Sequence, residues 1–170
     1  MKQHFMMFAT YNQWANGRLY DAVADLGEEE LGRDVGAFFG SMLGTLNQLL
    51  AVDRVWMKRF TGEGDAPSNT SAILYRALPA LKLAREAEDK RILDWMNGMS
   101  DKALAGRFSY TTLTDMRTVS QRLSPALGHF FNHQTHHRGQ AHMVLTMLGR
   151  PSVPLDLMLF QRSEEGRAYA

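Results

Sequence analysis

The chain contains no cysteine among its 170 residues. Disulfides, thiolate metal ligands and a nucleophilic cysteine are therefore excluded, and any metal must be held by nitrogen or oxygen donors. An excess of one charge is lacking as well, because 19 basic residues balance 18 acidic ones without a long block of either sign. This balance argues against a nucleic-acid partner, which a basic patch would mark.

Long hydrophobic runs are also absent. No stretch of the sequence approaches the roughly 20 apolar residues that a membrane span requires. Residues 1–23 do not resemble a signal peptide, because Gln, His, Asn and Arg interrupt their apolar positions. We therefore expect no membrane association and a cytoplasmic location. The 45% hydrophobic composition suits one compact domain that spans residues 1–170.

Helix-period patterns dominate what is present. Long helices are expected at about residues 2–26, 40–62, 79–98 and 124–149. Ser41 and Ser124 stand where N-caps are expected, and Gly62 and Gly149 stand where two of the helices should end. Four long helices with short connections predict an all-α, four-helix bundle.

Residues 107–121 interrupt the helical pattern. They are rich in Thr, Ser and aromatic residues, with Thr114–Asp115 as a candidate turn. Such a composition is typical of extended chain, so we expect a loose hairpin between the third and fourth helices.

Four of the six histidines fall within residues 131–142, which read FNHQTHHRGQAH. At about 100° per residue, His133 and His137 lie within about 40° of each other, on the same stripe as Ala141 and Val144. Two imidazoles spaced i, i+4 on one helix face can hold one metal ion. The pair is therefore a candidate for metal ligands, and two hydrogen-bonded core histidines are the alternative.

The other histidines do not extend this pair. His129 precedes His137 by about 12 Å along the helix, whereas zinc–nitrogen bonds are only about 2.1 Å long. His136 is expected at the rim, and His142 and His4 are expected in solvent. A third ligand must therefore come from another helix.

The chain resembles the DinB/YfiT-like family of helical-bundle metalloproteins. The resemblance runs through YNQWAN (11–16), residues 38–62, REAEDKRI (85–92) and FNHQTHHRGQAHMVL (131–145), in the family's order. It implies a damage-inducible type of protein with an up-down-down-up bundle and short extra helices. It also implies a divalent metal, nickel or zinc, held by one histidine of the second long helix and by His133 and His137.

Gln48 occupies the position of that third histidine, because the chain reads TLNQ where similar sequences read TLNH. Gln48 shares a helix face with Val52 and Val55, within about 40°. Its amide oxygen is a weaker donor than imidazole for zinc or nickel. Three outcomes are open. The metal is held by His133, His137, Gln48 and water, or the site binds metal weakly or takes a harder ion. In the third, the site is empty and Gln48 forms a hydrogen bond with a histidine.

Two nearby polar residues receive other interpretations. Asp53 lies about 140° around the helix from Gln48, so we expect it to pair with a neighbouring helix or with Arg54. Arg138 is expected either to contact an anionic substrate group or to form a surface salt bridge.

Two functions remain open at this stage. The resemblance implies a metal-dependent enzyme, either thiol-dependent and S-transferase-like or hydrolase-like, whose metal lowers the pKa of a low-molecular-weight thiol or a water. The alternative is a non-catalytic, dimeric binding module with a degenerate metal site, which Gln48 and the lack of a Ser-His-Asp or paired-carboxylate pattern favour. We expect a homodimer, and the enzyme would act on a small molecule. A DNA-binding regulator is disfavoured by the net charge of +1.

Overall fold

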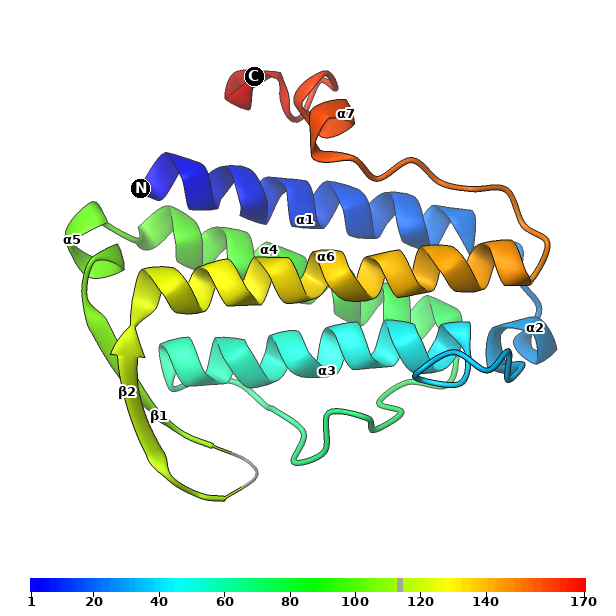
Figure 1. The fold of residues 1–170 in the computed structure, drawn as a ribbon, viewed down its shortest axis with the longest axis horizontal. Coiled ribbons are helices and arrows are strands. Elements are labelled where there is room, and N and C mark those ends of the chain that lie inside the picture. The colour runs from blue at the N-terminus through cyan, green and yellow to red at the C-terminus, as the bar shows by residue number, and fades with distance from the viewer. Residues whose placement is uncertain (113–114) are drawn as a thin grey trace.

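A computed structural model describes residues 1–112 and 115–170 of the chain. The four long helices are α1 (Lys2–Ala22), α3 (Met42–Thr61), α4 (Leu78–Gly98) and α6 (Leu123–Met147). Each of α1 and α3 packs against both α4 and α6. The helices run up, down, down and up along the chain (Figure 1), which confirms the predicted all-α bundle.

Local chemistry sets the ends of α3 where they were predicted. The Ser41 side-chain oxygen accepts a hydrogen bond from the Gly44 amide, 3.1 Å away, and so caps the first turn. At the other end Gly62 adopts a φ of 78°, the left-handed conformation that glycine accepts readily. Its amide donates to the Lys58 carbonyl at 2.8 Å. Both ends follow from residues within one turn of the boundary.

The start of α6 differs from the prediction. The helix begins at Leu123, directly after a strand, so Ser124 lies inside the first turn and is not the N-cap. The Leu123 amide donates to the Gly106 carbonyl at 3.0 Å, a bond from outside the helix that replaces a cap. The predicted stop at Gly149 is confirmed, because its φ is 73° and the Arg150 amide reaches back to the Leu145 carbonyl.

The predicted hairpin is present between α4 and α6. Strands β1 (Arg107–Thr111) and β2 (Thr118–Arg122) pair antiparallel, with Arg107 opposite Arg122. The candidate turn at Thr114 lies outside the described residues.

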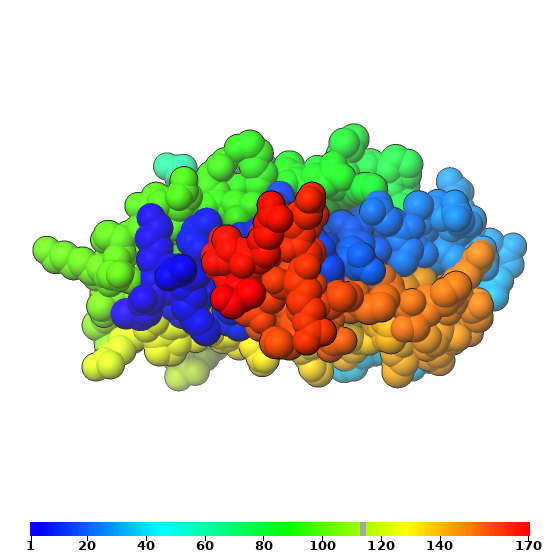
Figure 2. All heavy atoms as spheres, turned by 90° about the horizontal axis from the view of Figure 1, so that it is seen from above, coloured from blue at the N-terminus to red at the C-terminus, as the bar shows by residue number. Residues whose placement is uncertain are grey.

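Short helices fill the remaining connections. They are α2 (Glu28–Gly32), α5 (Asp101–Leu104), α7 (Leu157–Gln161) and the 3₁₀ turn η1 (Arg167–Tyr169). After α6 the chain turns back and lies over α1, where the C-terminal residues cover the bundle (Figures 1 and 2). Within the described part of the chain, no helix is long and apolar enough to cross a membrane.

The core has an apolar cluster at each end of the bundle and a polar layer between them. One cluster includes Phe5, Trp56, Met96 and Phe130. The other includes Leu19, Leu46, Leu81 and Leu145. The layer between them contains the buried polar residues Asn12, Asn16, Asp53, Arg85, Asp89, Gln134 and Arg138, which we call the buried charge network. These seven residues come from all four long helices, so the network ties the bundle together at its middle.

Candidate metal centre

Helices α3 and α6 bring the three predicted ligands together. The His133 and His137 rings lie on one face of α6, with their centroids 4.2 Å apart. Gln48 faces them from α3, and its Nε2 atom lies 3.5 Å from His133 Nε2. The histidine pair comes from one turn of α6, and the packing of α3 on α6 brings Gln48 next to it. The three side chains thus converge from two helices at the middle of the bundle.

Two polar atoms of this cluster are buried without a partner. Among the described residues, neither Gln48 Oε1 nor His133 Nδ1 has a hydrogen-bond partner. An unsatisfied buried acceptor costs on the order of 1–3 kcal/mol, so such atoms are rare in native proteins. A half turn of the Gln48 amide would exchange its oxygen with the nitrogen that now faces His133. The residues present therefore fit a cation that accepts an amide oxygen beside imidazole nitrogens.

Gln140 fixes the orientation of His137. Its Oε1 atom lies 2.7 Å from His137 Nδ1, and an amide oxygen can only accept, so Nδ1 carries the proton. The lone pair of His137 is then left on Nε2. Metal-bound histidines in proteins nearly always have their other ring nitrogen held in this way. The ring of Phe39 packs edge-on against His137 at 5.3 Å and encloses the site on that side.

The chain matches the DinB family model over residues 1–168. It belongs to the DinB family. A relative is Protein DinB of Bacillus subtilis (strain 168), which is 24% identical over 156 residues that cover 88% of this chain and 89% of that protein. The resemblance found in the sequence motifs is therefore confirmed across the DinB bundle.

His133 and His137 are both neutral near pH 7. Burial and, to a lesser extent, the neighbouring His137 lower the pKa of His133 to about 4. Burial also lowers the pKa of His137, against the opposing effect of its hydrogen bond to Gln140. Metal ions bind the unprotonated ring, so no proton has to be displaced from the pair before a metal can bind.

Of the remaining histidines, His136 and His129 border the pair, whereas His142 lies apart. The His136 ring centroid lies 4.8 Å from that of His137. The exposed His129 packs its ring against Trp56 at 5.2 Å and lies 5.9 Å from the His133 ring. His142 points to the opposite side of α6, where its Nε2 lies 3.1 Å from Ser152 Oγ. Among the described residues, no three His, Cys, Asp or Glu side chains form a metal-binding group, so Gln48 is needed to complete a three-ligand site.

Asp53 and Arg138 turn out to be part of the buried charge network. Asp53 is fully buried and pairs with Arg85 of α4 at 2.8 Å, which agrees with the predicted neighbouring-helix partner. The surface salt bridge expected of Arg138 is wrong, because this side chain is only 2% exposed. It points toward α1, away from the histidine pair, and donates to Asn12 Oδ1.

Sequence reasoning missed most of the network. Arg85 and Asp89 are spaced i, i+4 on α4 and contact each other at 3.0 Å, yet both are buried. Asn16 donates to the Asp89 carboxylate at 2.9 Å, and Gln134 donates to Asp53. The available signal was the Asn12 and Asn16 pair on an otherwise apolar face of α1. Charged residues at helical spacing look the same in a sequence whether they face solvent or a neighbouring helix.

Proposed function

We propose that this DinB-family chain is a divalent-metal-dependent enzyme that acts on a small molecule with a low-molecular-weight thiol or water as the nucleophile. The observation that carries the proposal is the unpartnered, buried Gln48 oxygen beside two neutral imidazoles. A site that served only the core would pair these groups with hydrogen-bond donors and acceptors.

The proposed roles follow from the contacts. His133 and His137 would hold the metal through ring nitrogens, Gln48 would supply an amide oxygen, and Gln140 keeps His137 in the tautomer that can ligate. Three protein ligands are the number found in catalytic zinc sites, which keep one position open for substrate. Because all three ligands are neutral, a bound divalent ion keeps its full charge and lowers the pKa of a water or thiol beside it.

Nickel or zinc is the metal that two imidazoles favour, whereas the amide oxygen suits a harder ion and weakens the affinity. We therefore propose a metal that binds less tightly than it would at a three-histidine site.

One contact favours a second function. The Gln48 amide nitrogen lies 3.5 Å from His133 Nε2, so the side chain can bond to the ring directly and close the site. The chain would then act as a non-catalytic binding module, as a homodimer. The two functions differ in whether the site takes up a metal.

The test is metal analysis of protein purified without an affinity tag or chelator, followed by titration with zinc and nickel. We expect about one metal per chain. His133→Ala should weaken metal binding by at least about 100-fold, because loss of a ligand costs no less than loss of an outer partner. His142→Ala on the opposite side of α6 is the matched control and should bind metal normally.

Activity is then assayed with a small thiol and a chromogenic electrophile. Metal-dependent turnover should be present in the wild type and in His142→Ala and absent in His133→Ala. A chain that takes up no metal on titration, or a His133→Ala variant that retains it, would show the proposal to be wrong. Metal uptake without turnover by either a thiol or water would support the metal site but contradict the proposed enzymatic activity.

A further inference from the structure

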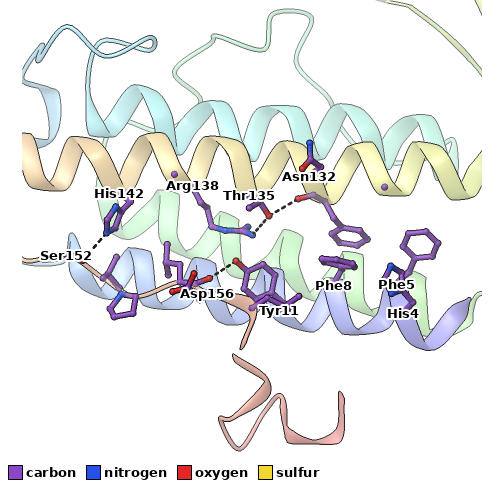
Figure 3. Close-up of a pocket in the computed structure, with 17 residues that line it drawn as sticks. His4, Phe5, Phe8, Tyr11, Asn132, Thr135, Arg138, His142, Ser152 and Asp156 are labelled. Atoms are coloured by element: carbon purple, nitrogen blue, oxygen red, sulfur yellow. Dashed lines mark hydrogen bonds between the residues drawn. The ribbon is translucent and has the colours of Figure 1, made fainter. Parts of the chain in front are cut away.

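A cavity lies on the opposite side of α6 from the histidine pair. It has a volume of about 710 Å³ and is formed by α1, α6 and the C-terminal segment 152–157 (Figure 3). Ligand pockets in proteins typically measure about 300–1,000 Å³, so this cavity has the size of a small-molecule site.

The wall of the cavity is mostly apolar and aromatic. The Phe8 and Phe131 rings stack at 5.9 Å, and Phe5 stacks on Phe131 at 6.4 Å. Leu155 and Leu157 of the C-terminal segment contribute aliphatic surface. These side chains come from α1, α6 and the segment that crosses them, so an apolar ligand would be enclosed on three sides.

Arg138 is the buried cation of this cavity, and among the described residues no carboxylate forms a salt bridge with it. Its side chain is 2% exposed and lies with its guanidinium 5.1 Å from the Tyr11 ring. Its acceptors are neutral: Asn12 Oδ1, Asn16 Oδ1 at 3.4 Å and Thr135 Oγ1 at 3.5 Å. Within the described chain Arg138 makes no salt bridge, and its Nε atom has no hydrogen-bond partner.

The contrast with Arg85 shows that this arrangement is not required by burial alone. Arg85 is equally buried, yet carboxylates lie 2.8 Å and 3.0 Å from it, those of Asp53 and Asp89. A buried cation with no directly paired anion is destabilising, because its desolvation is only partly compensated. Burial lowers the pKa of Arg138, against the opposing effects of Tyr11, Asp89 and Asp53. A ligand that brings a negative charge into the cavity would reduce this cost.

We propose that the cavity binds a small amphipathic carboxylate, whose carboxylate pairs with Arg138 and whose apolar part packs against Phe8 and Phe131. Arginine matches a carboxylate with two parallel donors, and the free Nε is one of the donors that such a pair uses. The aromatic wall selects the apolar part of the ligand.

Asp156 gives the proposal a further consequence. It also lines the cavity, and its exposed carboxylate makes no salt bridge with a described residue. A like charge near the entry repels an anionic ligand, so the affinity should rise when Asp156 is made neutral.

The first experiment is calorimetric titration of the full chain with octanoate and with octanamide, its uncharged counterpart. We expect octanoate to bind at least about tenfold more tightly, because only octanoate can pair with the Arg138 charge. Asp156→Asn should raise the octanoate affinity and leave the octanamide affinity unchanged. Equal affinities for the two probes, or no octanoate binding, would overturn the proposal.

Two further variants separate the cavity from other surfaces. Gly139 lines the cavity, and a Cβ built there meets no atom within 4 Å, so Gly139→Leu should fill the cavity without disturbing α6. We expect it to weaken octanoate binding at least about tenfold. Gly17→Leu is the matched control, because Gly17 is a helical glycine outside this cavity with equally open space. Unchanged octanoate binding in Gly139→Leu would overturn the proposal.

Arg138→Met tests the charge itself and should reduce the octanoate affinity to that of octanamide. If this variant does not fold, the Gly139 and Asp156 variants still decide the matter. His133→Ala should bind octanoate like the wild type, since the cavity lies on the other side of α6. Loss of octanoate binding in His133→Ala would instead place the ligand at the histidines.

Discussion

The middle of the bundle contains two buried polar clusters that differ in how their groups are paired. In the buried charge network, the Arg85 charge is compensated by the carboxylates of Asp53 and Asp89. At the histidine pair, the Gln48 oxygen and a His133 nitrogen are buried with no partner in the described chain. Paired charges compensate each other's burial, whereas a buried polar atom without a partner carries an uncompensated desolvation cost. This difference separates a structural polar cluster from a candidate binding site.

The two polar clusters are also connected by hydrogen bonds of Gln134 on α6. Gln134 lies between His133 and His137 in the sequence, and its amide donates to Asp53 and to the Leu49 carbonyl of α3. These bonds fix the rotation of α6 about its own axis. We infer that the buried charge network positions the histidine pair toward Gln48, which is a known use of buried polar groups.

The largest expected effect comes from breaking the charge network. Arg85→Met keeps the size of the side chain but leaves the carboxylates of Asp53 and Asp89 buried and uncompensated. Burial already raises the pKa of Asp53 to about 7, against the opposing effect of Arg85. Removing one partner of a buried pair costs about 3–5 kcal/mol. We therefore expect the free energy of unfolding in urea to fall by that amount.

Lys90→Met is the matched control on the same helix. Lys90 pairs with Asp94 in an exposed i, i+4 salt bridge. Exposed pairs contribute about 1 kcal/mol at most, so the control should change the stability little. If Arg85→Met were no more destabilising than Lys90→Met, the network would not hold the bundle together.

The next largest effect concerns the unpaired side. Gln48→His replaces the amide with the imidazole that the family resemblance implies at this position, and imidazole is the better ligand for zinc and nickel. We expect the affinity for these ions to rise at least about tenfold, which corresponds to about 1.4 kcal/mol of binding free energy. Competition with a chelator measures the affinity. Gln13→His, at an exposed position on α1, controls for the added histidine. An unchanged affinity would mean that position 48 does not face the metal.

The sequence allowed the features that depend on local chemistry to be predicted. The ends of α3 at Ser41 and Gly62 depend on one turn of helix, and the common face of His133 and His137 depends only on the helical period. Gln48 lies on another helix, so its place opposite the pair came from the family resemblance. The 3.5 Å contact between Gln48 and His133 shows that the two helices do bring them together.

The features that were missed depend on contacts between distant elements. The start of α6 was misplaced because Leu123 bonds to Gly106 of the preceding hairpin rather than to a local cap. The burial of Arg85 and Asp89 was not predicted, because it depends on Asp53 and Asn16 of other helices. A spacing of i, i+4 is compatible with a buried or an exposed environment.

The last expected effect is a pH dependence that arises from the histidine pair. The pKa of His133 is about 4 in the folded chain and near 6.5 when unfolded, so below pH 6.5 the unfolded chain binds more protons. The contribution of His133 to stability therefore rises with pH between about 4 and 6.5 and is fully present above that range.

The measurement compares metal-free wild type with His133→Ala. As the pH falls from about 6.5 to about 4, the unfolding free energy of the wild type should decrease relative to that of the variant. Between pH 7 and 8 the difference should stay constant, which serves as an internal control. A difference that is equally constant from pH 7 to 4 would show that the His133 ring can be protonated in the folded bundle without cost, and the site would then be open to solvent rather than prepared for a metal.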